Sequence, residues 1–410
     1  MGKRVILHID VNNAFLSWTA VDRLKNGDKV DIRKRFSVIG GDEDSRRGVV
    51  LAKSNLCKSR GVVTGESLYM ARRKCPYLDV YKGNRDVYKK YSDLMYEYLL
   101  NYTNIIERYS IDECFLDYTY SVKLFGDPIK IAYKIKEDIK NKFGFTVNVG
   151  IGNNKLQAKM ASDFSKPDKV HTLFDEDIKT KMWPLPIEEL FMLGKSSAIK
   201  LREMGINTIG DIANSDINLL IKKFKSHGKL MWEFANGIDN SEVSYIEHDA
   251  KSISSSTVLP YNYSNRDEML KIMRSLSMEV GKRLRESCMF AKNVSIWIKY
   301  SNFVKVSKQI NLDNVIYTDN EIYTNSVMLF DKLWNKEDNV RGLCVGVSNL
   351  KNNNDKQLSL FDMGNTSNKK EIKDDKLQKV LDSIRSKYGD DKIMYADMIK
   401  KDKRWYEWKL

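Results

Sequence analysis

The sequence predicts an α+β protein of several domains, and three features support this fold class. The chain has 410 residues, which is enough for roughly two to four domains. Its first 173 residues carry strand and helix patterns in the order βα, an inserted unit and ββαβ, a split-βαβ layout. A helical block follows at 174–238, and residues 253–350 predict strand, helix, strand, strand, helix, strand.

The composition indicates a polyanionic partner and a reducing compartment. Lys and Arg number 69 against 55 Asp and Glu, a net charge of +14 that most often points to nucleic acid. The 5 cysteines are scattered without paired spacing, which argues against disulfides and a zinc site. Because we find no signal peptide and no apolar run of membrane-spanning length, we expect a cytoplasmic protein without a membrane partner.

The first strand and helix could bind phosphate. Residues 4–10 predict a buried strand that ends in Asp10, and the apolar spacing of 12–24 predicts a helix. A strand that runs directly into a helix leaves free backbone N–H groups, here at Asn13 and Ala14. A carboxylate beside them suits a metal-bound triphosphate, and the alternative is an ordinary strand–helix unit.

A small inserted unit at 31–79 has a strand–turn–strand pattern. Its basic residues, Lys53 and Lys58 among them, could bind an anion or equally form a solvated face. The turn at 40–44 resembles the signature turn of diguanylate cyclases, which leaves a nucleotide cyclase as an alternative enzyme.

An acidic pair, Asp112 and Glu113, separates two strand-type segments at 105–111 and 114–118. Neighbouring side chains of a regular strand point to opposite faces, so the pair could share a ligand only at the crown of a tight hairpin. Two carboxylates without a cation repel each other, and a divalent metal relieves that repulsion. Because Asp10 ends a similar strand, the pattern favours a metal site over a solvated turn.

The rest of the first block predicts a tyrosine-rich helix at 84–104, a helix at 129–143, a strand at 145–151 and a helix at 155–164 that Pro167 terminates. This order would bring both acidic sites to one edge of the sheet.

Two later segments suit DNA. Helices are expected on both sides of 190–195, which suggests a helix–hairpin–helix that offers Gly194 and Lys195 to a phosphate. After a polar linker, the strand pair 294–300 and 304–310 alternates apolar with polar or cationic residues. A face carrying Lys299, Lys305 and Lys308 could follow a DNA backbone.

The last sixty residues predict a flexible tail, because 351–376 is rich in Asn, Lys and Asp. Inside it, the apolar residues of Gln357-Leu358-Ser359-Leu360-Phe361 have no core to join, so this run predicts a docking peptide. One helix is expected at 377–388, without an assigned function.

Several motifs together resemble the Y-family translesion DNA polymerases of the DNA polymerase IV and UmuC type. They are Ile9-Asp10-Val11 with Phe15 beyond it, Ser110-Ile111-Asp112-Glu113, Val149-Gly150-Ile151 and Lys166-Pro167. The likeness runs in order through about the first 350 residues. It implies a right-hand polymerase with a palm at 1–30 and 80–173, fingers at 31–79, a helical thumb at 174–238, a linker at 239–252 and a little finger at 253–350.

The resemblance also implies roles for single residues. Asp10, Asp112, Glu113 and the Val11 carbonyl would hold two Mg²⁺ ions, which prefer such all-oxygen ligands. Phe15 would be a steric gate against a ribose 2′-hydroxyl; a core aromatic is the alternative. The implied nucleotide contacts are Asn13, Ala14, Phe15, Lys53, Asn55, Lys58 and Lys166. The run 357–361 resembles the peptide that binds the bacterial sliding clamp.

The chain departs from the family in two places. DNA polymerase IV-like members carry Thr, Tyr and Arg on the triphosphate, where this chain has Ala52, Asn55 and Lys58. Lys58 offers a point charge instead of a bidentate fork, so we expect weaker nucleotide binding unless Lys53 compensates. Met192 stands where relatives often have Gly.

The sequence therefore predicts an error-prone, template-directed DNA polymerase that copies past damaged bases without proofreading. Its expected partners are primer–template DNA, dNTP and the sliding clamp, and its expected state is a monomer. Two alternatives stay open: a nucleotide cyclase that holds metals with 42–44, and a non-catalytic DNA-binding protein tethered to the clamp.

Overall fold

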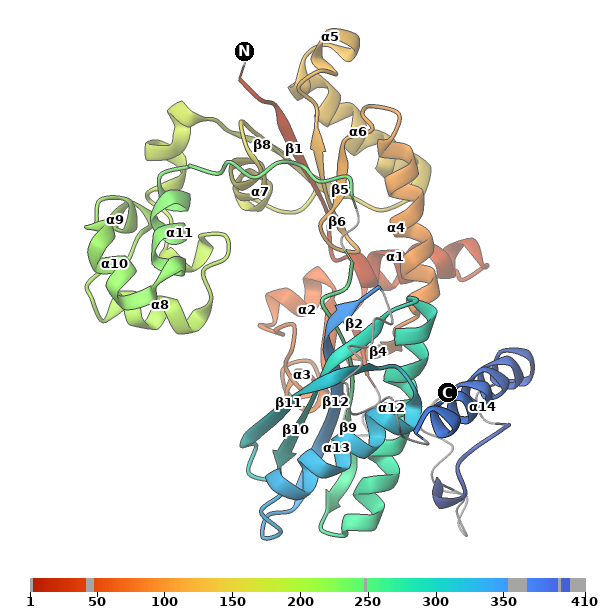
Figure 1. Ribbon diagram of the computed structural model, residues 1–410. Helices are drawn as coiled ribbons and strands as arrows, with labels where there is room; N and C mark the ends of the chain where they lie inside the picture. The colour runs from red at the N-terminus through yellow and green to blue at the C-terminus, as the bar shows by residue number, and fades with distance from the viewer. Residues whose placement is uncertain (1–2, 42–47, 247–248, 353–366, 390–391, 399–410) are drawn as a thin grey trace. The chain divides into compact units, whose positions relative to one another are not determined.

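The computed structural model describes residues 3–41, 48–246, 249–352, 367–389 and 392–398 (Figure 1). The chain divides into two compact units, residues 1–42 with 48–247, and residues 43–47 with 248–410. Both units combine sheets with helices, so the predicted α+β multidomain class is confirmed. Across the described ranges, every helix is too short or too polar to cross a membrane.

The first unit is built on a five-stranded sheet in the order β5-β6-β1-β7-β8. Its strands are β1 (Ile6–Val11), β5 (Ile106–Arg108), β6 (Glu113–Asp117), β7 (Val147–Gly152) and β8 (Val170–Leu173). β1 is antiparallel to β6 and β7, and β8, which was not predicted, pairs in parallel with β7. The expectation that both acidic sites come to one edge of the sheet agrees with the register, in which Asp10 and Glu113 are direct partners. They lie at one end of two inner strands.

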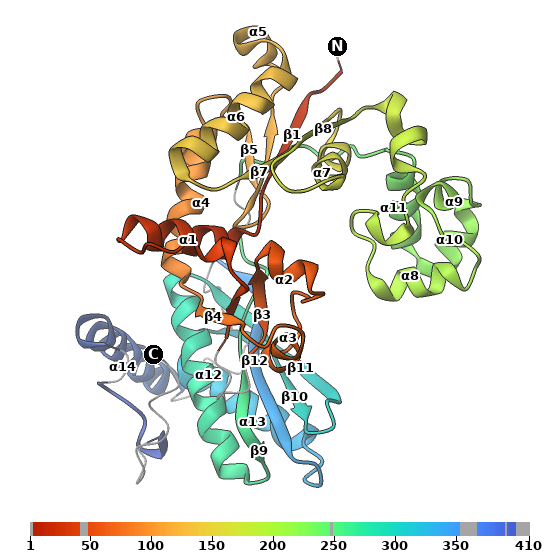
Figure 2. The same ribbon diagram turned by 180° about the vertical axis from the view of Figure 1, so that it is seen from behind.

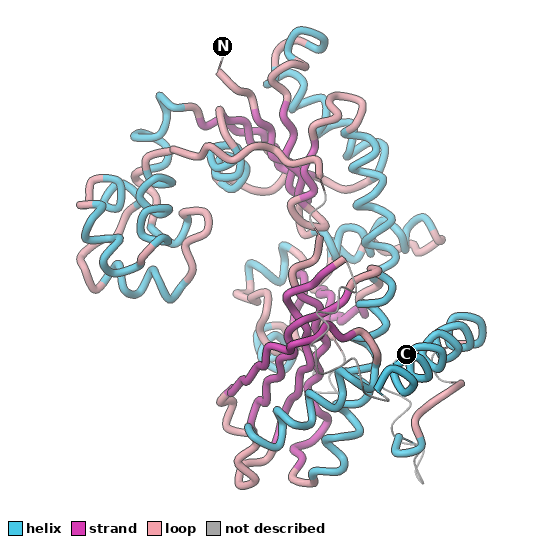
Figure 3. The backbone as a smooth tube through the Cα atoms, in the orientation of Figure 1, coloured by secondary structure: helices cyan, strands magenta, loops and turns pink. Residues whose placement is uncertain are grey.

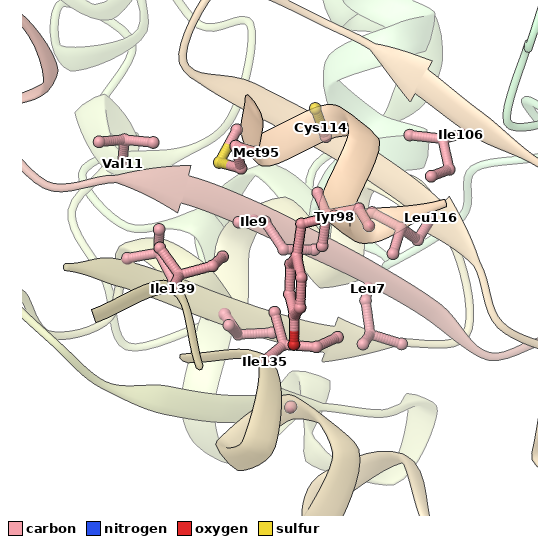
Figure 4. Close-up of a cluster of buried hydrophobic side chains, with 14 of the residues drawn as sticks. Leu7, Ile9, Val11, Met95, Tyr98, Ile106, Cys114, Leu116, Ile135 and Ile139 are labelled. Atoms are coloured by element: carbon pink, nitrogen blue, oxygen red, sulfur yellow. The ribbon is translucent and has the colours of Figure 1, made fainter. Parts of the chain in front are cut away.

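Helices cover both faces of this sheet. The helices are α1 (Ala14–Lys25), α4 (Arg85–Leu99), α5 (Val122–Phe125), α6 (Pro128–Phe143) and α7 (Lys155–Asp163). Leu7, Ile9 and Val11 of β1 join a core with α1, α4 and α6, and Figure 4 shows this layer of side chains. Each aliphatic side chain buried there contributes about 1.5–3 kcal/mol. α7 covers the opposite face, where Ala158 packs with Phe115.

Gly150 on β7 allows the close approach of α7. A Cβ atom at this position would lie 1.9 Å from the carbonyl oxygen of Ala158 and 2.4 Å from the backbone nitrogen of Ser162. The glycine in the Val149-Gly150-Ile151 motif is therefore required by packing between strand and helix.

We expect Gly150→Ala to lower the free energy of unfolding by about 3 kcal/mol, since backbone atoms cannot move aside as a flexible side chain would. Chemical denaturation of the full chain measures this. Gly194→Ala is the control: no atom lies within 4 Å of the added Cβ, so its cost should stay within about 1 kcal/mol. Equal costs for the two variants would contradict the packing argument.

The inserted unit has a three-stranded sheet in the order β3-β2-β4. Its strands are β2 (Ser37–Gly40), β3 (Val50–Lys53) and β4 (Asp79–Lys82), and Figure 2 labels α2 (Asn55–Ser59) and α3 (Leu68–Lys74) beside them. β4 was not predicted, and it crosses the expected boundary between fingers and palm at residue 79. Residues 42–44, which the cyclase alternative requires, lie outside the described residues.

The predicted helix–hairpin–helix is only partly present. The helix after the hairpin is α8 (Lys195–Arg202), but the segment before it is a single 3-10 turn at Ile187–Glu189. Met192 adopts a φ of 66°, the left-handed conformation that glycine favours. Gly194 lies in open space and Lys195 is exposed, so both remain accessible. The other helices of this block are α9 (Ile209–Ala213), α10 (Ile217–Phe224) and α11 (Ser226–Ala235).

The predicted linker at 239–252 forms no helix or strand in 239–246 and 249–251, but its first half, 239–244, is bound to the palm. Val243 is buried with Phe115, and the backbone nitrogen of Ser244 donates to Glu107, 2.8 Å away. Lys155 reaches the same Glu107 carboxylate at 2.7 Å. The amino-acid composition of a segment does not show whether its polar side chains are solvated or bind partners far away in the chain.

The second unit has the predicted order of elements. Its sheet, β11-β10-β12-β9, carries two helices on one face (Figure 3). The elements are β9 (Ser252–Tyr263), α12 (Arg266–Glu286), β10 (Phe290–Tyr300), β11 (Lys305–Ile316), α13 (Asp319–Leu333) and β12 (Val340–Lys351).

The three lysines predicted for one basic face do not share it. Lys299 and Lys305 are direct partners across β10 and β11, on the face away from the helices. Lys308 pairs with Ile296, whose side chain is buried in the core, so Lys308 points to the helix-covered face. The expectation is therefore wrong for Lys308.

The predicted flexible tether at 351–376 is wrong for residues 367–376, which belong to a helix. α14 spans Ser367–Tyr388, ten residues longer than predicted at its start. Arg385 donates to Asp319 at 2.9 Å, and Arg285 bridges Asp319 at 2.9 Å and Asp382 at 2.6 Å. Asp319 is only 1% exposed, so ion pairs tie this helix to α12 and α13.

We expect Arg385→Met to release α14, because an undocked helix of this length is marginal in water. Hydrogen exchange should then show loss of amide protection across 376–388, with the remainder of the unit unchanged. Lys387→Met, an exposed position on the same helix, is the control. Equal protection in both variants would mean that the ion pair does not hold the helix.

Candidate active site

The strand register brings two of the predicted carboxylates together. Asp10 and Glu113 are direct partners across β1 and β6, so their side chains lie next to each other on the face covered by α7. Asp112 precedes β6, in the turn that follows β5, and its carbonyl accepts a hydrogen bond from the Val11 nitrogen at 3.1 Å. The acidic pair thus lies at the hairpin turn, as the sequence analysis required for a shared ligand.

Two lysines contact these carboxylates. Lys166 forms a hydrogen-bonded ion pair with Asp10, and its Nζ is also 2.8 Å from Asp163. Lys159 donates to Glu113 at 2.9 Å and lies 3.6 Å from Asp10. Lys166 was predicted to bind a triphosphate, and here it pairs with Asp10. Lys159 was not predicted at all.

One signal could have revealed Lys159. The run Leu-Gln-Ala-Lys-Met-Ala-Ser at 156–162 is mostly apolar or small and carries no second charge, and the structure buries all of it. A lysine inside such a helix needs a buried partner of opposite charge.

His8 is the second contact that was not predicted. Its ring is fully buried, Nδ1 lies 2.8 Å from the Ser162 hydroxyl, and Nε2 lies 3.6 Å from Glu113. Because the hydroxyl already donates to the Lys159 carbonyl at 2.7 Å, Nδ1 is the donor of the pair. Burial lowers the pKa of His8, and the neighbouring Glu113 carboxylate opposes this effect.

The pKa values of Glu113 and Asp112 are shifted in opposite directions. Burial would raise the pKa of Glu113, but its contacts with His8 and Lys159 outweigh burial and lower that pKa to about 2. Burial raises the pKa of Asp112, the negative charges of Asp10 and Glu113 raise it further, and a 2.6 Å hydrogen bond from Ser110 opposes them.

The residue types fit magnesium, although the side chains are turned to other partners. Three carboxylates and a backbone carbonyl form an all-oxygen set, which Mg²⁺ prefers. Within the described ranges, no three His, Cys, Asp or Glu side chains converge closely enough to hold a metal ion. The lysines explain this, since Lys159 and Lys166 draw Glu113 and Asp10 towards their ammonium groups.

The nucleotide contacts predicted on α1 lie next to the carboxylates in sequence and structure. Asn13 has a left-handed φ of 49° and begins α1 without a side-chain cap, which leaves backbone N–H groups of the first turn free of such a partner. The Asn13 amide donates to Asn55 of the fingers at 3.4 Å. The structure thus brings together one predicted residue from each of the two subdomains.

Phe15 is half-buried and stacks on Tyr88 of α4. The centroids of the Phe15 and Tyr88 rings lie 4.5 Å apart, with an interplanar angle of 20°. The centroid of the Trp18 ring lies 6.3 Å from that of Phe15. Phe15 is therefore packed against the core and retains an exposed portion, which reconciles the gate with its core alternative.

The basic residues of the fingers are less closely tied to the site. Lys53 donates to Thr64 at 3.2 Å, and burial followed by the charge of Lys58 lowers its pKa. Lys58 is exposed on α2, and Ala52 is buried. The peptide at 357–361 lies outside the described residues.

Comparisons with known proteins agree with this geometry. Residues 9–163 match the model of the impB/mucB/samB family, and 250–360 match that family's C-terminal domain. The chain is 47% identical to DNA polymerase IV of Clostridium acetobutylicum, covering 98% of this chain and 100% of that protein. It is 34% identical to DNA polymerase IV 2 of Bacillus subtilis, covering 97% and 95%.

Solved structures show the same fold. A Y-family DNA polymerase chimera of Dbh and Dpo4 matches with a TM-score of 0.74 at 23% identity, covering 85% of this chain and 100% of that one. DinB from Sulfolobus solfataricus matches with a TM-score of 0.54. With two family models in order and a relative at 47% identity over nearly its whole length, the chain belongs to the impB/mucB/samB family of Y-family translesion DNA polymerases.

Proposed function

We propose that this DNA-directed DNA polymerase extends primers past damaged bases, transferring a nucleotidyl group from dNTP to the primer 3′-hydroxyl without proofreading. The observation that carries the proposal is the pairing of Asp10 with Glu113 beside the turn residue Asp112. Family membership supports the polymerase class. The residues support the chemistry.

Asp10, Asp112, Glu113 and the Val11 carbonyl are the groups that would hold two Mg²⁺ ions. Magnesium bound there would lower the pKa of the primer 3′-hydroxyl and neutralise the negative charge of the leaving pyrophosphate. The chain's own part is to gather the carboxylates at one end of two rigid strands, which fixes their positions relative to the α1 N-terminus.

The nucleotide would lie between palm and fingers. Backbone N–H groups at Asn13 and Ala14 would donate to phosphate oxygens, and Phe15 would contact the sugar. For Lys166 to reach the triphosphate, its ammonium has to leave Asp10, and its 35% exposed side chain has room to do so. Asn55, Lys53 and Lys58 offer fewer and weaker contacts than a bidentate Arg, so we expect modest nucleotide affinity.

The DNA contacts would be made to phosphates. Gly194 and Lys195 are accessible at the start of α8, and Lys299 and Lys305 share one exposed face of the second unit. Such contacts fix position without reading sequence, which suits a polymerase that copies any template. The peptide 357–361 would tether a cytoplasmic monomer to the bacterial sliding clamp.

Primer extension on undamaged and abasic templates, with Mg²⁺ and either dNTPs or rNTPs, tests this function. Short extension that needs dNTPs and reads through the abasic position is the expected result. The Asp42→Asn variant distinguishes the polymerase from the cyclase alternative, because this substitution would abolish the activity of a cyclase and leave that of a polymerase unchanged. A well-folded, DNA-binding protein that never extends a primer, even with clamp added, would favour the non-catalytic binder and overturn the proposal.

A further inference from the structure

Lys159 of α7 lies between three acidic side chains, those of Asp10, Glu113 and Asp163, and the sequence predicted no role for it. Its Nζ is 2.9 Å from Glu113, 3.6 Å from Asp10 and 3.5 Å from Asp163. The side chain is only 10% exposed. An ammonium group therefore occupies a buried position between two carboxylates that are expected to bind metal.

The second lysine at the site is held differently. Lys166 pairs with Asp10 and Asp163, but its side chain is 35% exposed, and a triphosphate could draw it away. Lys159 has no comparable freedom, because α7 is packed directly onto β7 at Gly150. When Lys166 leaves, Lys159 is the cation that stays.

Among the residues that the structure describes, Lys159 is the lysine or arginine that pairs with Glu113. His8 Nε2 lies 3.6 Å from Glu113 and forms no hydrogen bond. A buried carboxylate without a cation would be costly, and its neighbour Asp10 would add repulsion. Asp112 has no basic partner among the described residues, so the compensation is confined to Asp10 and Glu113.

We propose that Lys159 is a positioning residue that serves as a resident counter-ion: it holds Glu113 and Asp10 together before metal arrives, and it weakens the binding of that metal. This inference rests on the proposed function, since it concerns the same carboxylates. An ammonium group and a divalent cation compete for the same oxygens, so the lysine stabilises the metal-free protein and has to be partly displaced when metal binds.

Removing the charge should therefore have two opposite effects. Lys159→Gln keeps a long polar side chain but leaves the carboxylates uncompensated, which should lower the melting temperature of the metal-free protein by several degrees. The same variant should bind Mn²⁺ about tenfold more tightly than the wild type, because a nearby positive charge is gone. A residue with a merely structural role would destabilise the protein without tightening metal binding.

The experiment is a calorimetric titration of the full chain with Mn²⁺ alone, without DNA or nucleotide, together with thermal unfolding at zero and saturating Mn²⁺. Lys159→Arg keeps the charge and should bind Mn²⁺ as the wild type does. Lys155→Gln is the matched control: it lies one turn earlier on α7 and pairs with Glu107, so its Mn²⁺ affinity should not change.

Each outcome decides the matter. Tighter Mn²⁺ binding by Lys159→Gln alone, or a variant that folds only when Mn²⁺ is present, supports the counter-ion. Unchanged or weaker binding overturns it, as does a variant that stays unfolded at saturating Mn²⁺, since the metal should then replace the lysine. Because the readout involves no primer, a wild type that binds Mn²⁺ but never extends DNA would overturn the proposed function and leave this inference standing.

Discussion

Asp112→Asn should reduce primer extension by at least about a thousandfold, since one neutral amide replaces an ionised ligand at the reacting centre. The substitution keeps the shape of the side chain, and the hydrogen bond from Ser110 can still reach its remaining carbonyl oxygen. Burial and two negative neighbours raise the pKa of Asp112, and a bound cation would stabilise its ionised form. Its neutral replacement should fold well and yet fail to assemble the site.

Single-turnover extension with saturating dNTP and Mg²⁺ measures the loss, and circular dichroism with DNA-binding assays confirms that the variant is folded. Asp117→Asn is the matched control: it lies on the same strand pair, opposite Ile6 at the far end from Asp10. We expect this control to extend primers at close to the wild-type rate. An Asp112→Asn variant within tenfold of the wild type would contradict the assigned site.

The sequence predicted the central strands because their patterns are long and local. Residues 5–9 are apolar except for His8, and β1 is buried along its whole length. β4 and β8 were missed because each has only four residues and mixes polar with apolar side chains. Both pair in parallel with strands far away in the chain, and no local period records such a pairing.

The charged residues were harder to predict than the apolar ones. Asp10, Asp112 and Glu113 stood out because each follows or interrupts an apolar run, but nothing local indicates that Asp10 lies opposite Glu113. Lys308 alternates in step with Val306 and Ile310 and out of step with Lys305, so the period of a strand itself predicts the helix-covered face. Its ammonium stays exposed there because β11 is an edge strand. Glu107 and Asp319 bind distant partners, Ser244 and Arg385, which lie in segments that composition alone assigned to a linker and a tail.

The second large effect is expected from Phe15→Ala, which should lower the preference for dNTP over rNTP by about a hundredfold or more. Discrimination against a single added hydroxyl requires a rigid group at the place where the hydroxyl would sit, since a merely apolar pocket rejects it weakly. The Phe15 ring is such a group: it stacks on Tyr88 at 4.5 Å and contacts Trp18, so it cannot easily rotate away. An alanine would leave an open space at the exposed side of that stack.

The effect is measured as the ratio of kcat/KM for dCTP to kcat/KM for CTP opposite template guanine. We expect kcat/KM for CTP to rise by a much larger factor than kcat/KM for dCTP falls. Tyr88→Phe retains the stacked ring and loses only a hydroxyl that lies 3.4 Å from Thr19, so it should keep the wild-type ratio. Tyr88→Ala removes the support and should give an intermediate ratio, because Phe15 then gains freedom to move. If Phe15→Ala excluded CTP as well as the wild type does, Phe15 would be a core aromatic and another group would bar the ribose.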